Sequence, residues 1–446
     1  LHFDTRENRA LPGRFRVATR GSETLGEFLD LPEAARATLA TASPGDAQRA
    51  ELRKVYRQRH VAEAQQTTKL LADKRKEREA HEKSFPTAMV MRDLEKPRPT
   101  HLLIRGEYNN PGEAVTPGVP EKIFPWREGL PPNRLGLAQW LLDPAHPLTA
   151  RVVVNQYWQK YFGAGLVRTG EEFGAQGEWP SHPELLDWLA TEFIRTGWDI
   201  RAMQRLIVTS HTYRQDARVT PELLEQDPEN RLLARGPRFR MEAEGVRDIA
   251  MAVSGLLNPK VGGPSVFPYQ PPGLWGQVTF EGPPDYVQGA GDENCRRGLY
   301  TYWRRSIPYA AFTILDAPDR ETCTVRRPRT NTPLQALNLL NDPVYVEAAR
   351  AFAHRILTQG GASVDDRLRY AFRVALARPP ADAERARLAA ALAREQARFA
   401  ADRTAANRLV HVGASKPPVD VDIVELAAWT VLANTLLNLD ETITKG

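Results

Sequence analysis

Cysteine and histidine are scarce in this chain, which has two cysteines and nine histidines among 446 residues. A fold stapled by several disulfides is therefore excluded. No Cys-x-x-Cys-His sequence occurs, so c-type haem cannot be attached covalently within these residues. The histidines form neither His-x-x-x-His nor His-Glu-x-x-His, and we predict no metal site. Gly-x-Ser-x-Gly is also absent, which argues against a serine hydrolase.

Long apolar runs are missing as well. No stretch approaches the ~20 apolar residues that a membrane helix needs, so no membrane span is predicted. The sequence starts at Leu1 without the charged and apolar segments of a signal peptide, as though cut from a longer chain. The net charge of +5, from 60 basic and 55 acidic residues, is small for this length and does not indicate nucleic-acid binding.

What is present is the composition of a globular protein, with 42% hydrophobic and 26% charged residues. The length predicts two or three domains. Residues 13–18 predict one strand, so we interpret residues 1–31 as the tail of a preceding β domain. Residues 32–132 predict a charged helical arm, with a helix or helix pair over 46–83, then a short hairpin of strands at 88–91 and 101–104. The hairpin leads into a crossing rich in proline and glycine.

Residues 133–446 predict a mainly helical domain. Apolar residues recur there at helical spacing. The predicted helices span 134–142, 148–161, 182–196, 200–213, 333–357, 364–376, 382–409 and 422–439. A long irregular insert rich in glycine and proline covers 256–294. The fold class we expect is mainly α: a multi-helix, bundle-like domain with long Pro/Gly-rich loops and a few short strands near the N-terminus.

Several blocks of sequence resemble a known family. They are Arg105-Gly106-Glu107-Tyr108, Asn155-Gln156-Tyr157-Trp158, His182-Pro183-Glu184-Leu185-Leu186-Asp187-Trp188, Asp316-Ala317-Pro318 and Thr330-Asn331-Thr332-Pro333-Leu334-Gln335. In order and spacing, residues 84–440 resemble the second of two large domains of unknown function in planctomycete-type secreted cytochromes. The resemblance implies export to the periplasm or cell surface and a multidomain parent. It implies c-type haem only in an upstream module, with no cofactor in this segment.

The loop before residue 182 supplies the first group of candidate site residues. Glu171, Glu172, His182 and Asp187 combine carboxylates with a histidine, a set that can bind a metal or move protons. The alternative is structural: Ser181 would cap the following helix, with Glu184 at the capping-box position. No ligand spacing decides between these interpretations.

Three arginines supply the second group. Arg326, Arg327 and Arg329 precede a predicted helix start, where Thr332 is placed to act as the cap. Guanidinium groups beside a helix N-terminus are a candidate site for a carboxylate, sulfate or phosphate. The alternative is that nearby carboxylates, including Asp316, pair with the arginines and lock the loop.

The cysteines and the aromatic residues of the insert leave alternatives open. Cys295 and Cys323 are candidates for a disulfide in an oxidising compartment, and Cys323 beside arginines is also a candidate for an activated thiol. Aromatic residues of the insert either stack on sugar rings or pin the loop to the core. They are Phe267, Tyr269, Trp275, Phe280 and Tyr286.

Three functions remain as hypotheses. The first is a non-catalytic helical scaffold or interaction domain of a large exported, cytochrome-associated bacterial protein, which contacts upstream modules of its parent, other exported proteins or cell-surface polysaccharide. The second is an enzyme domain acting on an anionic or polysaccharide substrate. The third is a docking surface for a c-type haem module in electron transfer. Convergence of His182, Glu171, Asp187 and Arg326 in one pocket favours the enzyme, and their dispersal into separate ion pairs favours the scaffold.

Overall fold

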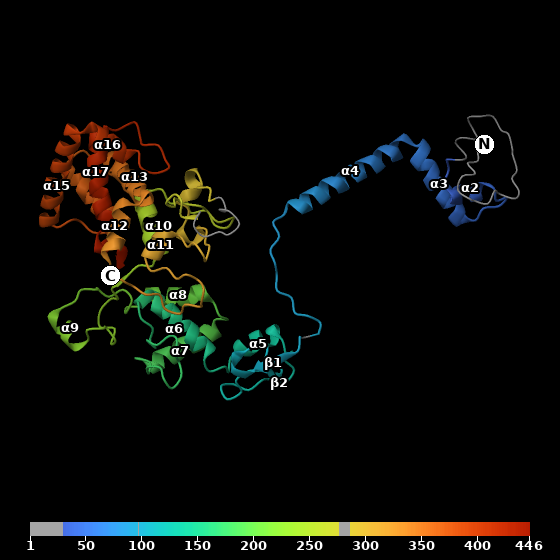
Figure 1. The fold of residues 1–446 in the computed structure, drawn as a ribbon, viewed down its shortest axis with the longest axis horizontal. Helices are drawn as coiled ribbons and strands as arrows, with labels where there is room; N and C mark the ends of the chain where they lie inside the picture. Colours follow the sequence, from blue (N-terminus) through green and yellow to red (C-terminus); the bar gives the residue numbers. More distant parts are fainter. Residues whose placement is uncertain (1–29, 97, 276–285) are drawn as a thin grey trace. The chain divides into compact units, whose positions relative to one another are not determined.

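A computed structural model describes residues 30–96, 98–275 and 286–446 (Figure 1). The predicted strand at 13–18, and most of the predicted β tail, lie outside the described residues. The chain divides into two compact units, Leu1–Thr100 and His101–Gly446. This division lies upstream of the domain boundary that we expect near residue 133, and that boundary stays a prediction. No described helix has the length and apolar character needed to cross a membrane.

The described part of the first unit is helical. Its helices are α2 (Glu33–Leu39), α3 (Asp46–His60) and α4 (Ala62–Ser84). Helix α4 buries none of its residues. Ion pairs one turn apart, such as Lys74 with Glu77 at 2.7 Å, cover its surface. The charged helix predicted over 46–83 is thus a helix pair.

The hairpin forms in a different place from the one predicted. Strand β1 (Thr100–Leu103) pairs with β2 (Pro111–Val115), whereas residues 88–91 belong to no strand. The chain reverses immediately after β1, where Arg105 and Gly106 have φ angles of 55° and 77°. Because this left-handed turn returns the chain at once, β1 finds its partner downstream.

Two groups of helices make up most of the second unit. After α5 (Arg134–Leu141), the first group consists of α6 (Thr149–Phe162), α7 (Pro183–Arg195), α8 (Ile200–Thr209) and the short α9 (Pro221–Gln226). Trp158 and Phe162 on α6 stack at 4.1 Å between ring centroids, within a core that includes Phe193 of α7. These aromatic residues belong to the core, as their helical spacing predicts.

The second group is larger. It contains α10 (Ala243–Ser254), α11 (Ala310–Ile314), α12 (Pro333–Asn341), α13 (Pro343–Gln359), α14 (Val364–Leu376), α15 (Asp382–Ala401), α16 (Arg403–Val410), α17 (Ile423–Leu437) and α18 (Asp440–Ile443). Helix α17 is apolar all round and packs against α13, α15 and α16. Its Trp429 is fully buried, so α17 forms the centre of this core.

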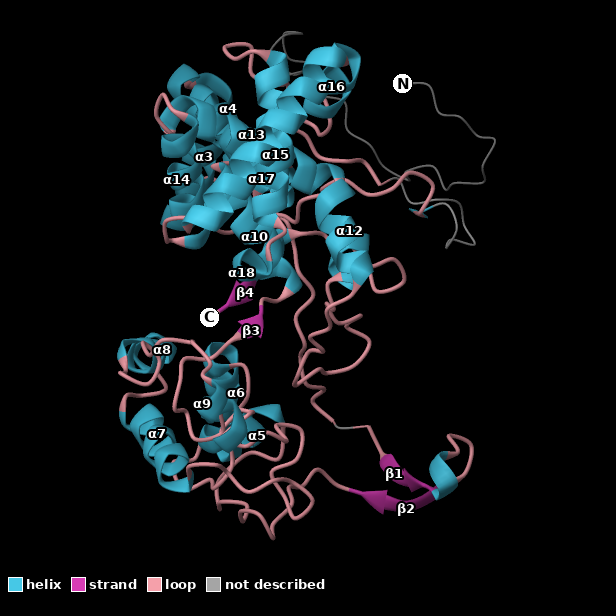
Figure 2. Ribbon diagram, turned by 90° about the vertical axis from the view of Figure 1, so that its left-hand side faces the viewer, coloured by secondary structure: helices cyan, strands magenta, loops and turns pink. Residues whose placement is uncertain are grey.

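A short two-stranded ribbon lies between the two helix groups (Figure 2). Strand β3 (Phe239–Arg240) pairs antiparallel with β4 (Thr444–Lys445), with Phe239 opposite Lys445. This pairing brings the last residues of the chain beside the segment that joins α9 to α10. The expectation of a mainly α fold with few short strands is confirmed.

Two predicted helices are broken in the structure. The range 333–357 splits at Asp342, because Pro343 disfavours helical geometry in the residue before it. The range 382–409 splits at Asp402. Both aspartates cap the helix that follows: Asp342 accepts from the Val344 amide at 2.9 Å, and Asp402 from the Ala405 amide at 2.9 Å.

Arg378 joins three helices near the end of α14. Its guanidinium donates to the Glu384 carboxylate of α15 at 2.8 and 2.9 Å and to Glu441 of α18 at 2.6 and 2.7 Å. The hydrogen bonds from Arg378 to Glu384 lower the pKa of this carboxyl to about 2. A depressed pKa stabilises the fold above the unfolded-state value near 4.5, and this contribution is lost as the pH falls towards 2.

We expect Glu384→Gln to lower the free energy of unfolding by about 1 kcal/mol at neutral pH, a value limited by solvent screening of this partly exposed pair. Urea denaturation across the pH range should show this deficit shrinking below about pH 4.5. Asp382→Asn, at a side chain that is 95% exposed, is the matched control and should cost far less. A deficit of equal size at neutral pH and at pH 3 would contradict the assigned role of the carboxylate.

Candidate functional site

The block of sequence around Asp316 and Thr330 forms a closed hydrogen-bond network. Asp316 has a φ of 64°, and its carboxylate accepts from the Thr330 amide at 2.7 Å and from the Thr330 hydroxyl at 2.8 and 2.9 Å. The buried Gln335 amide nitrogen adds a bond to Asp316 at 3.1 Å and one to the Ile314 carbonyl at 3.0 Å. Thr332 caps α12, as predicted, by accepting from the Gln335 amide. The network fixes the entry to α12.

Arg327 forms a bidentate ion pair with Glu244 in the first turn of α10. The two nitrogen–oxygen distances are 2.6 and 3.2 Å. Burial opposes the ionised form of Glu244, but the hydrogen bonds from Arg327 and from its own amide outweigh that effect and leave its pKa below the usual value. Glu242 lies 3.6 Å from the same guanidinium. The charge of Arg327 is therefore neutralised within the fold.

Arg329 connects the two helix groups. It donates to the Gly163 carbonyl after α6 at 2.8 Å and lies over the Phe239 ring at 4.4 Å. Burial lowers the pKa of Arg329, opposed by Glu242. A side chain added at Gly163, whose φ is 83°, would meet Phe239 at 2.7 Å and the Arg329 guanidinium at 3.2 Å. This close approach requires glycine at the end of α6.

Arg326 is the exposed member of the trio and joins the two predicted site groups. Its Nε lies 3.5 Å from the Glu171 carboxylate, and both side chains are about half exposed. An exposed pair at this distance contributes little to stability. Glu171 and Arg326 are thus brought together, but on the surface.

A cleft of about 460 Å³ adjoins this arginine loop. Four cationic side chains and two carboxylates line it: Lys160, Arg320, Arg327, Arg329, Glu242 and Glu321. Lys160 pairs with Glu242, which in turn faces Arg327. Of the four cations, Lys160 and Arg327 thus share one wall carboxylate. The carboxylates expected to lock the loop are not the partners of the arginine trio: Asp316 holds Thr330, and Glu321 lies 3.8 Å from Arg305.

The other polar candidates lie apart from one another. The Glu172 carboxylate accepts from the Gly174 amide at 2.7 Å within its own loop. Asp187 accepts from Arg151 of α6 at 2.6 Å, and this hydrogen bond lowers the pKa of Asp187. His182 contacts the Ser181 hydroxyl at 3.0 Å. Among the residues described, no group of three His, Cys, Asp or Glu side chains gathers in a way that could hold a metal ion.

The predicted cap of α7 is wrong by one residue. The structure places His182 at the cap position, and no side chain caps the helix. Pro183 occupies the first turn, where its missing amide needs no partner. The Ser181 amide instead donates to the Leu166 carbonyl at 2.9 Å, which draws Ser181 away from the helix end.

Residues 133–392 match the family model PSD1, described as a protein of unknown function (DUF1553). The chain belongs to the DUF1553 family. No curated protein and no solved structure matches it. The matched range contains both site groups and the Asp316 network, while the description of the family names no activity.

The two cysteines of this DUF1553 chain are free thiols in the structure. Cys295 is half-buried, and burial raises the pKa of its thiol. Cys323 is exposed and borders the cleft beside Arg327. The structure does not join them, and the disulfide stays a prediction about the oxidised protein.

Aromatic residues of the insert pack on other rings of the fold. Phe267 stacks on Tyr302 at 4.6 Å, and Trp275 lies 4.9 Å from Tyr286, measured between ring centroids. Trp275 is 8% exposed. Phe280 lies outside the described residues. These contacts favour the interpretation that the rings anchor the loop to the core. They do not favour rings that are free to stack on a sugar.

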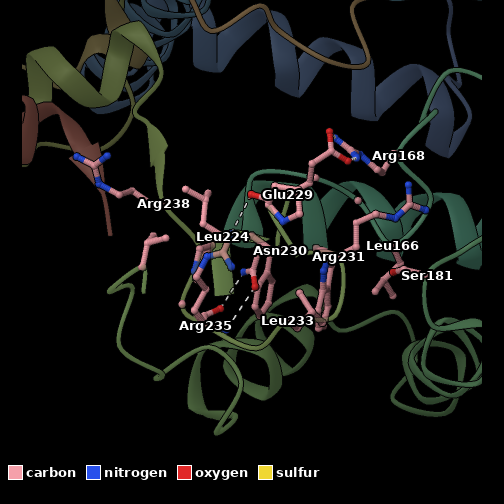
Figure 3. A pocket seen from close by; sticks show the side chains of 18 residues that line it. Leu166, Arg168, Ser181, Leu224, Glu229, Asn230, Arg231, Leu233, Arg235 and Arg238 are labelled. Atoms are coloured by element: carbon pink, nitrogen blue, oxygen red, sulfur yellow. Dashed lines mark hydrogen bonds and ion pairs between the residues drawn. The ribbon is translucent and has the colours of Figure 1, made fainter. Parts of the chain in front are cut away.

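A second cleft of the DUF1553 domain, of about 450 Å³, was not predicted from the sequence. Four arginines line it: Arg168, Arg231, Arg235 and Arg238 (Figure 3). Three of them fall within eight residues of one irregular loop before β3. That clustering is the one signal in the sequence that points to this cleft.

Proposed function

We propose that the chain is a non-catalytic helical interaction domain of a larger exported, cytochrome-associated bacterial protein. One observation carries this proposal: the four residues whose convergence an enzyme would need do not meet in one pocket, because only Glu171 and Arg326 pair with each other, and they do so on the surface. Glu171 faces Arg326, Asp187 holds Arg151, and His182 contacts Ser181. A catalytic acid or base must reach its substrate with a proton to give or accept. Carboxylates held in local ion pairs are poorly prepared for that role.

Rigid connections between the two helix groups support the same proposal. Arg329 holds the Gly163 carbonyl at the end of α6, and Lys160 of α6 holds Glu242 before α10. The β3–β4 ribbon adds a further connection. A domain that presents fixed surfaces to neighbouring modules benefits from such cross-links, whereas a closing active site needs parts that move. The exported setting and the upstream haem module come from the resemblance to secreted cytochromes.

A turnover assay tests the proposal. The purified chain would be incubated with neutral and acidic polysaccharides and with chromogenic phosphate, sulfate and carboxylate esters. We expect no release of reducing ends or chromophore above the rate without protein. Turnover lost in Glu171→Gln or His182→Asn, but kept in Glu184→Gln, would overturn the proposal and locate an active site. Glu184 lies two residues after His182, in the first turn of α7, which makes it the matched control.

A further inference from the structure

The arginine-lined cleft found above holds a buried cation without a carboxylate partner. Arg235 is only 7% exposed, and its guanidinium donates to the Pro228 carbonyl at 2.9 Å and the Leu223 carbonyl at 3.4 Å. No carboxylate of the described residues forms an ion pair with it. Asp227, the buried carboxylate of the same loop, instead accepts the amides of Arg231 and Leu232 at 2.8 and 2.7 Å.

A buried charge without a counter-ion is costly, because carbonyl dipoles replace only part of its lost hydration. Two other buried arginines among the described residues have a carboxylate nearby: Glu293 lies 3.8 Å from Arg296, and Glu347 lies 3.6 Å from Arg350. Arg247 also donates only to carbonyls, but it lies outside this cleft. Arg235 therefore combines an uncompensated charge with a position on a cavity wall.

The loop around Arg235 is held in place before any ligand arrives. The Asn230 side chain donates to the Arg235 carbonyl at 2.9 Å and accepts from the Arg235 amide at 3.3 Å. Figure 3 shows Asn230 and Arg235 between Arg168 at one end of the cleft and Arg238 at the other. A preorganised guanidinium loses little entropy when it binds an anion.

The remaining charges on the wall are predominantly positive. Arg168 pairs with Glu229, the one carboxylate that lines the cleft with the four arginines. Arg231 and Arg238 pair with Glu178 and Asp440, neither of which lines the cleft. A cavity with more cations than anions on its wall concentrates anions from solution.

Apolar side chains complete the wall. Val219 and Leu224 border the cleft and are 45% and 54% exposed, and the half-buried Leu233 also lines it. Exposed apolar groups close to cations suit a ligand that carries both an oxyanion and an apolar face. The volume lies in the range of pockets that hold small organic ligands.

We propose that this cleft binds a carboxylate or sulfate carried on a compact ring. The oxyanion takes the place of the missing counter-ion of Arg235, and one face of the ring packs on Leu224 and Val219. This inference does not depend on the absence of catalysis proposed above. The turnover assay and the binding experiment below can therefore fail independently.

Calorimetric titration of the whole chain tests the proposal with five probes: glucuronate, glucose 6-sulfate, benzoate, neutral glucose and inorganic sulfate. We expect at least one ring-borne anion to bind about tenfold or more tightly than glucose and inorganic sulfate. Comparing the affinities of the two sugar anions with the affinity of benzoate distinguishes a sugar ring from an aromatic ring. Equal binding of inorganic sulfate and the ring-borne anions would overturn the proposal, as would no binding of any ring-borne probe.

Variants locate the binding. Arg235→Gln should weaken the best probe by about tenfold to a hundredfold, because a charge-assisted hydrogen bond is lost. Leu224→Asp places a negative charge on an exposed wall position and should weaken binding similarly, even if Arg235→Gln fails to fold. Arg201→Gln, at an arginine that lines a separate cavity on α8, is the control and should bind normally. Normal affinity in Leu224→Asp would overturn the proposal.

Discussion

Arg247→Met is expected to lower the free energy of unfolding by about 3 kcal/mol. Arg247 projects from α10 and is 1% exposed, and its guanidinium donates to the Arg296 carbonyl at 2.6 Å and to the Asn294 carbonyl. Methionine fills most of the volume but leaves both buried carbonyl oxygens without a donor. Urea denaturation measures the loss.

The same substitution should loosen the irregular insert before the rest of the domain. Arg296, fully buried, holds the carbonyls of Lys260, Gly262 and Pro264 and stacks on Tyr300 at 3.7 Å. Since Arg247 holds the Arg296 carbonyl, its loss should also loosen the start of the insert, whose carbonyls Arg296 binds. Hydrogen exchange should therefore accelerate in residues 258–264 and 286–300 at denaturant concentrations where α17 stays protected.

Arg297→Met is the neighbouring control. Arg297 is 58% exposed and pairs with Asp248 at 3.2 Å, so its loss should cost less than about 1 kcal/mol. Equal costs for the two variants, or exchange that accelerates everywhere at once in Arg247→Met, would contradict the role of Arg247 as the tie between α10 and the insert.

The sequence predicted helices well where one face is apolar and the ends carry clear signals. Helix α14 has the predicted bounds, because Ser363 caps its start and the apolar face recurs regularly. The breaks at Asp342 and Asp402 were missed. Apolar spacing continues across both positions, although Pro343 was a signal that the helix must restart.

The candidate site was only partly predictable, because partners far apart in the chain cannot be read from local patterns. The arginine trio was named, but the sequence could not show that Arg327 meets Glu244 or that Arg329 meets Gly163. Arg235 was missed for a different reason. Its significance lies in a missing carboxylate, and burial without a counter-ion is a property of the fold, not of sequence spacing.

Asp316→Ala is expected to cost about 3 kcal/mol, from two separable effects. The first is the loss of the acceptor for the Thr330 amide, the Thr330 hydroxyl and Gln335. The second is backbone strain, because Asp316 has a φ of 64°, which aspartate tolerates better than alanine. Thermal and urea denaturation of purified variants measure the total.

Two further substitutions separate these effects. Asp316→Gly removes the acceptor but relieves the backbone, so it should be about 1 kcal/mol more stable than Asp316→Ala. Asp316→Asn keeps one acceptor oxygen and tolerates the left-handed backbone, and should cost about half as much as alanine. Asp319→Ala, which removes one exposed bond to the Glu321 amide at 2.9 Å, is the control and should cost less than about 1 kcal/mol. If Asp316→Ala were no worse than this control, the entry to α12 would not depend on the Asp316 network, and packing of α12 alone would have to position the arginine loop.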